Sequence, residues 1–135
     1  TGCMEPFGAL CDGVPDCLKK TRQQLRKQAD VIKVMPTGGV LSEFDQPTDT
    51  ELSLEEVTAI VEEAARAKRV VAAHAHGAGG IRTAIDAGIH TVEHGSYMTQ
   101  ELALDMKGAG MIYHPTEVIT QEFNVSEKPD FLDER

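Results

Sequence analysis

Three ionisable side chains stand at or near the ends of short, apolar, β-rich stretches of this sequence. Lys33 lies within the first stretch, and His74 and His94 end the next two. Alone, the lysine could be a salt-bridged strand-end residue, and each histidine a hydrogen-bonded core residue. That explanation is weaker for all three together, because the carboxyl ends of adjacent parallel strands meet at one edge of a sheet. The sequence therefore predicts that the three side chains share one site.

The residue types at this predicted site suit a divalent metal. Imidazole nitrogen is a common ligand for zinc and similar metals, whereas a protonated lysine cannot ligate. A buried lysine can lose its proton and add carbon dioxide, and the two oxygens of the resulting carbamate can bridge two cations. The combination of Lys33 with His74 and His94 therefore suggests metal chemistry, in which the lysine would take part as its carbamate.

A long irregular segment follows the stretch that carries Lys33. From Met35 to Ser53 the sequence has turn formers but no sustained period, which is an uncommon length for a loop. It leaves the carboxyl end of a strand, where α/β folds carry their sites, so it is a candidate lid. Gly38 and Gly39 at its start leave room for the backbone to approach a bound ligand.

Helical and extended patterns alternate along the chain. The clearest helix begins at Ser53, which with Glu56 forms a capping-box sequence. The expected strands are 31–35, 70–74, 89–94 and 111–114, and the expected helices are 15–28, 54–68, 79–87 and a stretch from Thr99 to the glycines at 108 and 110. This order is typical of βαβ units with right-handed crossovers and a parallel sheet.

The spacing of these units favours a barrel. From His74 to His94 there are 20 positions, and from His94 to His114 there are 20 more, which is one compact strand–helix unit each time. A (β/α)8 barrel typically needs about 250 residues, whereas this chain has 135. We predict an α/β fold that is part of a TIM-type barrel over residues 1–120, followed by a charged loop or frayed end at 121–135. A flavodoxin-like open sheet is the alternative.

Composition excludes some classes of partner. The net charge is −9, from 13 basic and 22 acidic residues, and nucleic-acid binding needs the opposite balance. No stretch approaches the roughly 18 apolar residues of a transmembrane helix. The cysteines at 3, 11 and 17 fit no zinc pattern and are expected to be reduced thiols. Thr1 is followed by no visible leader, so we expect a cytoplasmic protein.

Three motifs resemble one known family. The stretches VIKVMPTGGV at 31–40, VAAHAHG at 71–77 and TVEHG at 91–95 look like strands four, five and six of the metal-dependent amidohydrolase superfamily. The nearest branch holds prolidase-like and carboxypeptidase-like enzymes, imidazolonepropionase-related proteins and ochratoxinase. The resemblance implies that Lys33 is the carboxylated strand-four lysine, and that His74 and His94 are metal ligands. It places His76 either at the substrate or directly behind the metal ligands. Gly38 and Gly39 are expected at the substrate because their backbone can approach a ligand.

The resemblance also implies a reaction and what it needs. Such enzymes hydrolyse amide, peptide or related C–N bonds of small or dipeptide-like molecules with metal-activated water, at a dinuclear centre that is usually zinc. The family's His-x-His pair and its catalytic aspartate have no counterpart here, so this sequence corresponds to about strands four to seven and needs the remainder of a barrel or self-association. The alternative is a truncated, non-catalytic barrel fragment that acts only through association with a partner chain.

Overall fold

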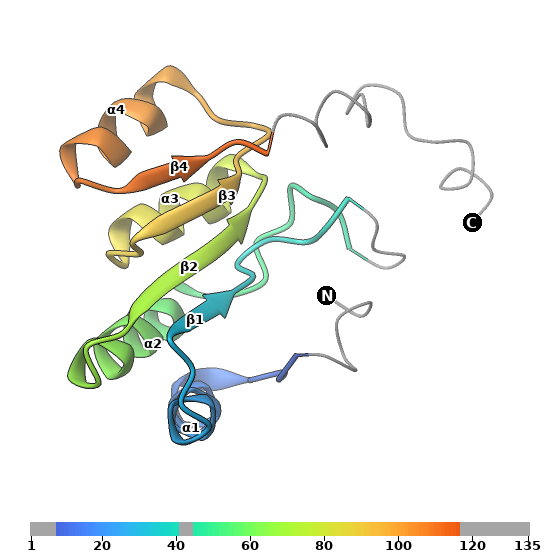
Figure 1. The fold of residues 1–135 in the computed structure, drawn as a ribbon. Coiled ribbons are helices and arrows are strands. Elements are labelled where there is room, and N and C mark those ends of the chain that lie inside the picture. The colour runs from blue at the N-terminus through green and yellow to red at the C-terminus, as the bar shows by residue number, and fades with distance from the viewer. Residues whose placement is uncertain (1–7, 41–44, 117–135) are drawn as a thin grey trace.

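Helices and strands alternate through the part of the chain that the computed structural model describes, residues 8–40 and 45–116. The elements are α1 (Gly13–Arg26), β1 (Val31–Val34), α2 (Leu54–Arg66), β2 (Val70–Ala75), α3 (Ala78–Asp86), β3 (Thr91–His94), α4 (Gln100–Gly108) and β4 (Ile112–His114). The strands are parallel and pair in chain order β1-β2-β3-β4. All their carboxyl ends, the arrowheads in Figure 1, therefore lie at the same end of the sheet. The predicted α/β alternation is confirmed. The expected tail at 121–135 lies outside the described residues.

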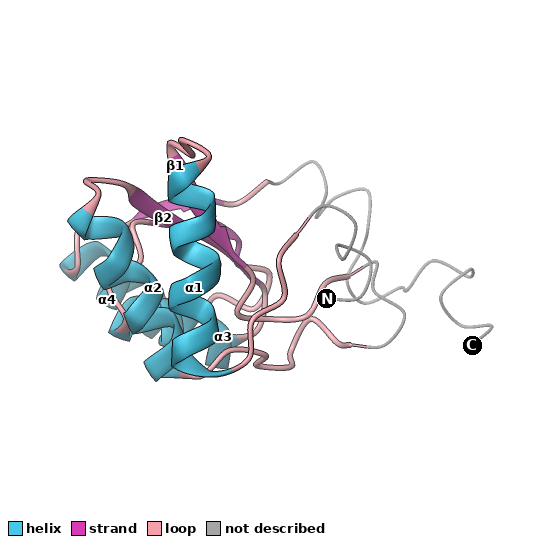
Figure 2. Cartoon of the chain, turned by 90° about the horizontal axis from the view of Figure 1, so that it is seen from below, coloured by secondary structure: helices cyan, strands magenta, loops and turns pink. Residues whose placement is uncertain are grey.

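One face of the sheet, the outer face, is covered by helices (Figure 2). Alternate strand residues point into this layer, among them Ile32 and Val34 of β1 and Val92 of β3. They meet the apolar stripes of the helices, represented by Val57 of α2 and Ile81 of α3, both fully buried. The continuous core of the described residues therefore lies between the sheet and its helices.

The opposite face, the inner face, carries a different set of side chains. Val31 is 47% exposed and Val70 is 41% exposed, although both stand on strands. Lys33, which pairs in register with Ala72, shares this face. Ile112 on the edge strand β4 is 56% exposed. An apolar strand face this open is what a barrel interior looks like when only part of the barrel surrounds it.

The described parts of the long segment after β1, residues 35–40 and 45–53, are fastened onto the rest of the fold. Thr37 forms an antiparallel bridge with Thr50, and the amide of Gly77 donates to the carbonyl of Pro47 at 2.9 Å. Gly80 of α3 lies so close to this segment that a Cβ there would overlap the Thr37 methyl group. The small residues at the start of α3 therefore let the segment pack over the edge where the strands end.

The first two helices are joined at their N-termini. The Ser53 hydroxyl accepts from the amide of Glu56 at 3.3 Å, and Glu56 accepts from the amide of Ser53 at 2.8 Å. The other oxygen of Glu56 accepts from the amide of Gly13 at 2.7 Å, at the start of α1. The predicted capping box is thus present, and one carboxylate ties α1 to α2.

The prediction of reduced thiols is wrong for two of the cysteines. Cys11 and Cys17 form a disulfide, with Cα atoms 4.9 Å apart, within the range that the bond requires. The chain turns at Gly13, where φ is +75°, and this turn brings Cys11 back over the first turns of α1. A six-residue spacing did not suggest this pairing because the turn is not apparent from the cysteines alone.

None of the helices in the described residues combines the length and apolar composition needed to cross a bilayer.

Candidate metal centre

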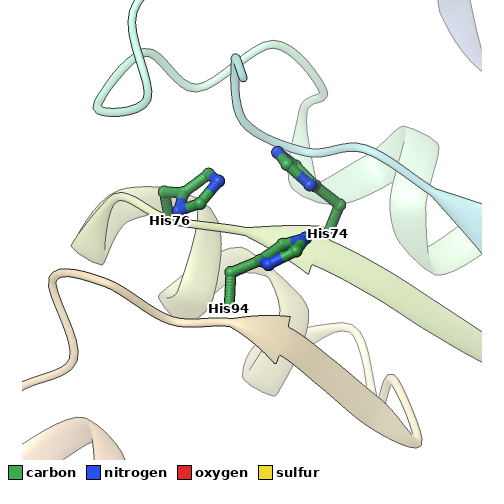
Figure 3. A group of neighbouring side chains, drawn as sticks. All are labelled: His74, His76 and His94. Carbon is green, nitrogen blue, oxygen red and sulfur yellow. The ribbon is translucent and has the colours of Figure 1, made fainter. Parts of the chain in front are cut away.

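Three histidine rings gather where β2 and β3 end (Figure 3). His74 lies on β2, His76 follows that strand directly, and His94 ends β3. Their ring centroids are 4.6 to 4.8 Å apart, and one ligand nitrogen from each lies within 4.8 Å of the others. The structure therefore brings together His74 and His94, as predicted from sequence, and adds His76 to the same cluster.

Each of these rings has one nitrogen in a hydrogen bond to the surrounding structure. His74 Nε2 lies 3.2 Å from the carbonyl oxygen of Gly38. His76 Nδ1 lies 2.8 Å from Ser96 Oγ, and His94 Nδ1 lies 2.7 Å from Thr116 Oγ1. A ring held through one nitrogen presents the other in a fixed direction, which is the usual arrangement of metal-binding histidines.

The cluster disfavours protonated imidazole. Burial is the largest cause that lowers the pKa of each ring. The charge of Lys33 lowers the pKa of His74 and of His94 further, while the carboxylate of Glu93 opposes this lowering in both. For His76, which is 4% exposed, burial and then the charges of His74 and His94 lower the pKa to about 3. Neutral imidazole is the form that ligates a metal, so the site holds its ligands ready at neutral pH.

Lys33 lies on the inner face and contacts an acidic residue, Glu93, that was not among the predicted site residues. Its ammonium group forms an ion pair with Glu93, and the hydroxyl of Thr91 donates to the other oxygen of that carboxylate at 2.7 Å. Lys33 pairs in register with Ala72, two residues before His74, and so shares the face of that ring. Its charge contributes to lowering the pKa of His74 and of His94. Strand alternation was the available signal, because Glu93 stands opposite His74 in register and so shares its face.

The two glycines expected near the substrate differ in their surroundings. Gly38 is packed beneath the returning segment, where its amide donates to Asp49 and its carbonyl contacts His74. A Cβ on Gly39 would meet no atom within 4 Å. Gly39 therefore borders open space, whereas Gly38 is packed and its carbonyl contacts the His74 ring.

The donor set fits a divalent metal such as zinc. Zinc–nitrogen bonds of 2.0–2.1 Å place two nitrogens of one tetrahedral ion about 3.3 Å apart, so small side-chain rotations would close the cluster around an ion. Two neutral imidazoles with an anionic oxygen ligand, or three imidazoles, both occur in such sites. The histidines thus suit the metal that the sequence motifs imply.

Comparison with known proteins identifies the family of this chain. Residues 2–127 match the model of the amidohydrolase family. The chain belongs to the amidohydrolase family. Ochratoxinase from Aspergillus niger is 46% identical over 121 residues, which cover 88% of this chain and 25% of that protein.

Solved structures of amidohydrolases contain the same fold. The crystal structure of A. niger ochratoxinase matches with a TM-score of 0.80 over 86% of this chain and 27% of that one, at 45% identity. A Xaa-Pro dipeptidase with methionine bound in its active site matches with a TM-score of 0.78 and 34% identity, over 90% of this chain and 31% of the other. This amidohydrolase chain therefore spans about a quarter to a third of these relatives, and its sheet is part of a TIM-type barrel.

Proposed function

We propose that this chain supplies one side of a metal-dependent hydrolytic site that cleaves amide, peptide or related C–N bonds. The observation that carries the proposal is the cluster of His74, His76 and His94 at the carboxyl ends of parallel strands. Barrel enzymes place their sites at this end, and neutral imidazoles suit zinc. Family membership and the relatives named ochratoxinase and Xaa-Pro dipeptidase support the type of reaction.

In this proposal His74 and His94 are metal ligands and Lys33 is the third. Carboxylation forms a bond between Nζ of the neutral amine and the carbon of carbon dioxide, with loss of one proton from nitrogen. The product carries a negative charge and two oxygens, and it can bridge two cations. To react, Nζ must leave Glu93, with which it now forms an ion pair. When bound, the metal supplies a water molecule of near-neutral pKa and polarises the scissile carbonyl.

His76 contacts the substrate in this proposal rather than the metal. If the Ser96 hydroxyl donates to Nδ1 of His76, the proton of the neutral ring stays on Nε2. An Nε2–H group that faces the cluster can donate a hydrogen bond to the carbonyl oxygen of a substrate. Gly39, which borders open space, offers backbone groups to the same molecule. Gly38 contributes indirectly through its contact with His74.

The remaining parts of the site are proposed to come from outside these elements. The chain covers 25% of ochratoxinase, and its inner face and edge strand expose Val31, Val70 and Ile112. We expect further barrel strands to cover these surfaces and to supply the His-x-His pair and the aspartate that the family resemblance implies. A small molecule or dipeptide would bind in the resulting enclosure.

The test is replacement of Lys33 in the full-length gene product that contains these residues. Lys33→Ala should lower metal content, measured by mass spectrometry. It should also lower hydrolysis of Xaa-Pro dipeptides or ochratoxin by more than about 100-fold, which is the largest loss typical of residues that only orient a metal ligand. Acetate or propionate should partly restore both by replacing the carbamate oxygens. Lys19→Ala on the exposed side of α1 is the matched control. Full metal occupancy with undiminished hydrolysis in Lys33→Ala would overturn the proposal.

A further inference from the structure

The backbone at the end of β3 turns in an unusual way. His94 has φ +76° and Gly95 has φ +59°, two consecutive residues in the left-handed region. Only a few per cent of non-glycine residues occupy this region, although histidine is among those found there more often, and such residues persist where the surrounding structure enforces them. We call these two residues the His94 corner.

The His94 corner decides which way the ring points. In register His94 stands beside Ala75, which is fully buried, and in its own strand it has the parity of Val92, which faces the helices. A regular strand would therefore direct His94 to the outer face. Its ring instead lies 4.7 Å from that of His74, on the inner side. The corner brings the side chain into the cluster.

Tyr113 of β4 holds the backbone of the corner. Its hydroxyl donates to the carbonyl oxygen of His94 at 2.9 Å and lies 3.5 Å from that of Gly95. Its ring lies on the corner as well, since a Cβ on Gly95 would come within 2.6 Å of Tyr113 Cε2. One aromatic side chain thus fixes the carbonyls that the left-handed turn exposes.

Thr116, just after β4, holds the ring itself. Its Oγ1 donates to the carbonyl of Pro115 at 2.7 Å and lies 2.7 Å from Nδ1 of His94. Because a hydroxyl has one proton, that bond leaves Oγ1 as the acceptor for Nδ1–H. The proton of the neutral ring is then on Nδ1, and the lone pair of Nε2 is directed to the cluster.

We propose that Tyr113 and Thr116 are positioning residues for His94: Tyr113 fixes the backbone corner and Thr116 fixes the tautomer, so that Nε2 is presented as a ligand. The ligand role rests on the proposed function above, whereas the tautomer does not. Neither residue touches a substrate in this assignment. Both come from β4 or its end, so this strand completes a ligand that belongs to its neighbour.

The test uses the full-length protein with two variants that each remove one contact. In metal-free protein with 15N-labelled histidine above neutral pH, long-range proton–nitrogen spectra should show His94 mainly as the Nδ1–H form. Thr116→Val should change its tautomer ratio by about fivefold, the factor that matches the net contribution of one hydrogen bond, and Thr116→Ser should restore it. Tyr113→Phe should leave the ratio unchanged, because it acts on the backbone.

Cobalt(II) binding, followed by its visible spectrum, gives the second readout. Both variants should weaken binding by roughly 10- to 100-fold, the range for residues that orient a ligand, whereas Thr58→Val on α2 should not. The thermal midpoint of the metal-free variants shows whether a loss reflects unfolding. An unchanged tautomer ratio in Thr116→Val, or unchanged cobalt affinity in both variants, would overturn the inference. If the wild-type protein binds no cobalt, the metal proposal fails, and the tautomer measurement still tests the role of Thr116.

Discussion

The two faces of the sheet are built on different principles. On the outer face, apolar strand residues such as Val92 pack against apolar helix residues such as Ile81, and both are fully buried. On the inner face, Lys33 and Glu93 form an ion pair while 40% and 19% of their side chains remain exposed. Over β1 to β3 the outer face is covered by helices of this chain, whereas the inner face leaves apolar and ionisable side chains exposed.

This difference separates what folds the chain from what it does. Burial of apolar surface supplies most of the stabilisation of a fold, and it is concentrated in the layer between helices and sheet. The ionisable groups that could do chemistry lie on the other side, where they contribute little apolar burial. A substitution on one face should therefore leave the property that depends on the other face largely intact.

The largest effect is expected on the inner face, where two neighbouring histidines should behave differently. His94→Ala removes a proposed ligand and should weaken zinc binding by at least about 1000-fold, beyond the 10- to 100-fold range for residues that only orient a ligand. His76→Ala should keep the metal and mainly raise KM or lower kcat, since His76 is proposed to contact substrate. Zinc titration and steady-state kinetics of the full-length variants would check both.

Unfolding measurements on the same proteins provide the control for this comparison. Metal-free His94→Ala should unfold within about 1 kcal/mol of the wild type, because this half-buried ring lies outside the apolar core. His76 is buried and bonded to Ser96, so His76→Ala should cost about 1–3 kcal/mol. Loss of zinc in His76→Ala to the same extent as in His94→Ala would instead make His76 a ligand. The cluster would then be a three-histidine site.

The next largest effect is expected on the outer face, where a substitution should change the stability of the fold but not metal binding. Ile81→Ala should destabilise the fold by about 2–5 kcal/mol, because a fully buried isoleucine leaves a cavity. The zinc stoichiometry of the folded fraction should stay at the wild-type value. Urea unfolding of the full-length protein measures the first quantity, and Leu104→Ala, at a position that is 60% exposed on α4, is the matched control. A metal-free Ile81→Ala as stable as this control would mean that the outer face is not the main source of stability.

Much of this division could be read from the sequence, because it depends on strand alternation. Ile32 and Val34 are buried and Lys33 is not, as a period of two requires. The apolar stripe of α2, its capping box and the order of elements follow from equally local signals. The barrel fragment itself was predictable from the regular length of the strand–helix units and from the family motifs.

The features that the sequence did not reveal depend on contacts between distant residues. Parity alone directs His94 away from His74, and only the left-handed corner brings the two rings together. Tyr113 and Thr116 hold that corner from β4, about 20 positions further along the chain, and neither carries a motif that marks it. The approach of His76 to the other rings likewise depends on the chain path after β2.

The smallest effect is expected at the exposed rim of the outer face, where Glu56 joins α1 to α2. Hydrogen bonds from the amides of Ser53 and Gly13 lower the pKa of the Glu56 carboxyl in the folded protein. A group whose pKa is lower when folded stabilises the fold above its unfolded pKa, and this contribution disappears as the pH falls through the folded value. Glu56→Gln should therefore lower stability at neutral pH but not in strong acid, which reduces the slope of stability against pH on the acid side of its unfolded pKa.

The measurement is urea unfolding of the metal-free protein at several pH values, with Glu55→Gln, whose side chain is exposed in the same turn, as the control. Because Glu56 lies at the rim, zinc affinity at neutral pH should be the same in both variants. An equal acid-side slope in Glu56→Gln and Glu55→Gln would show that ionisation of the Glu56 carboxyl does not stabilise the fold.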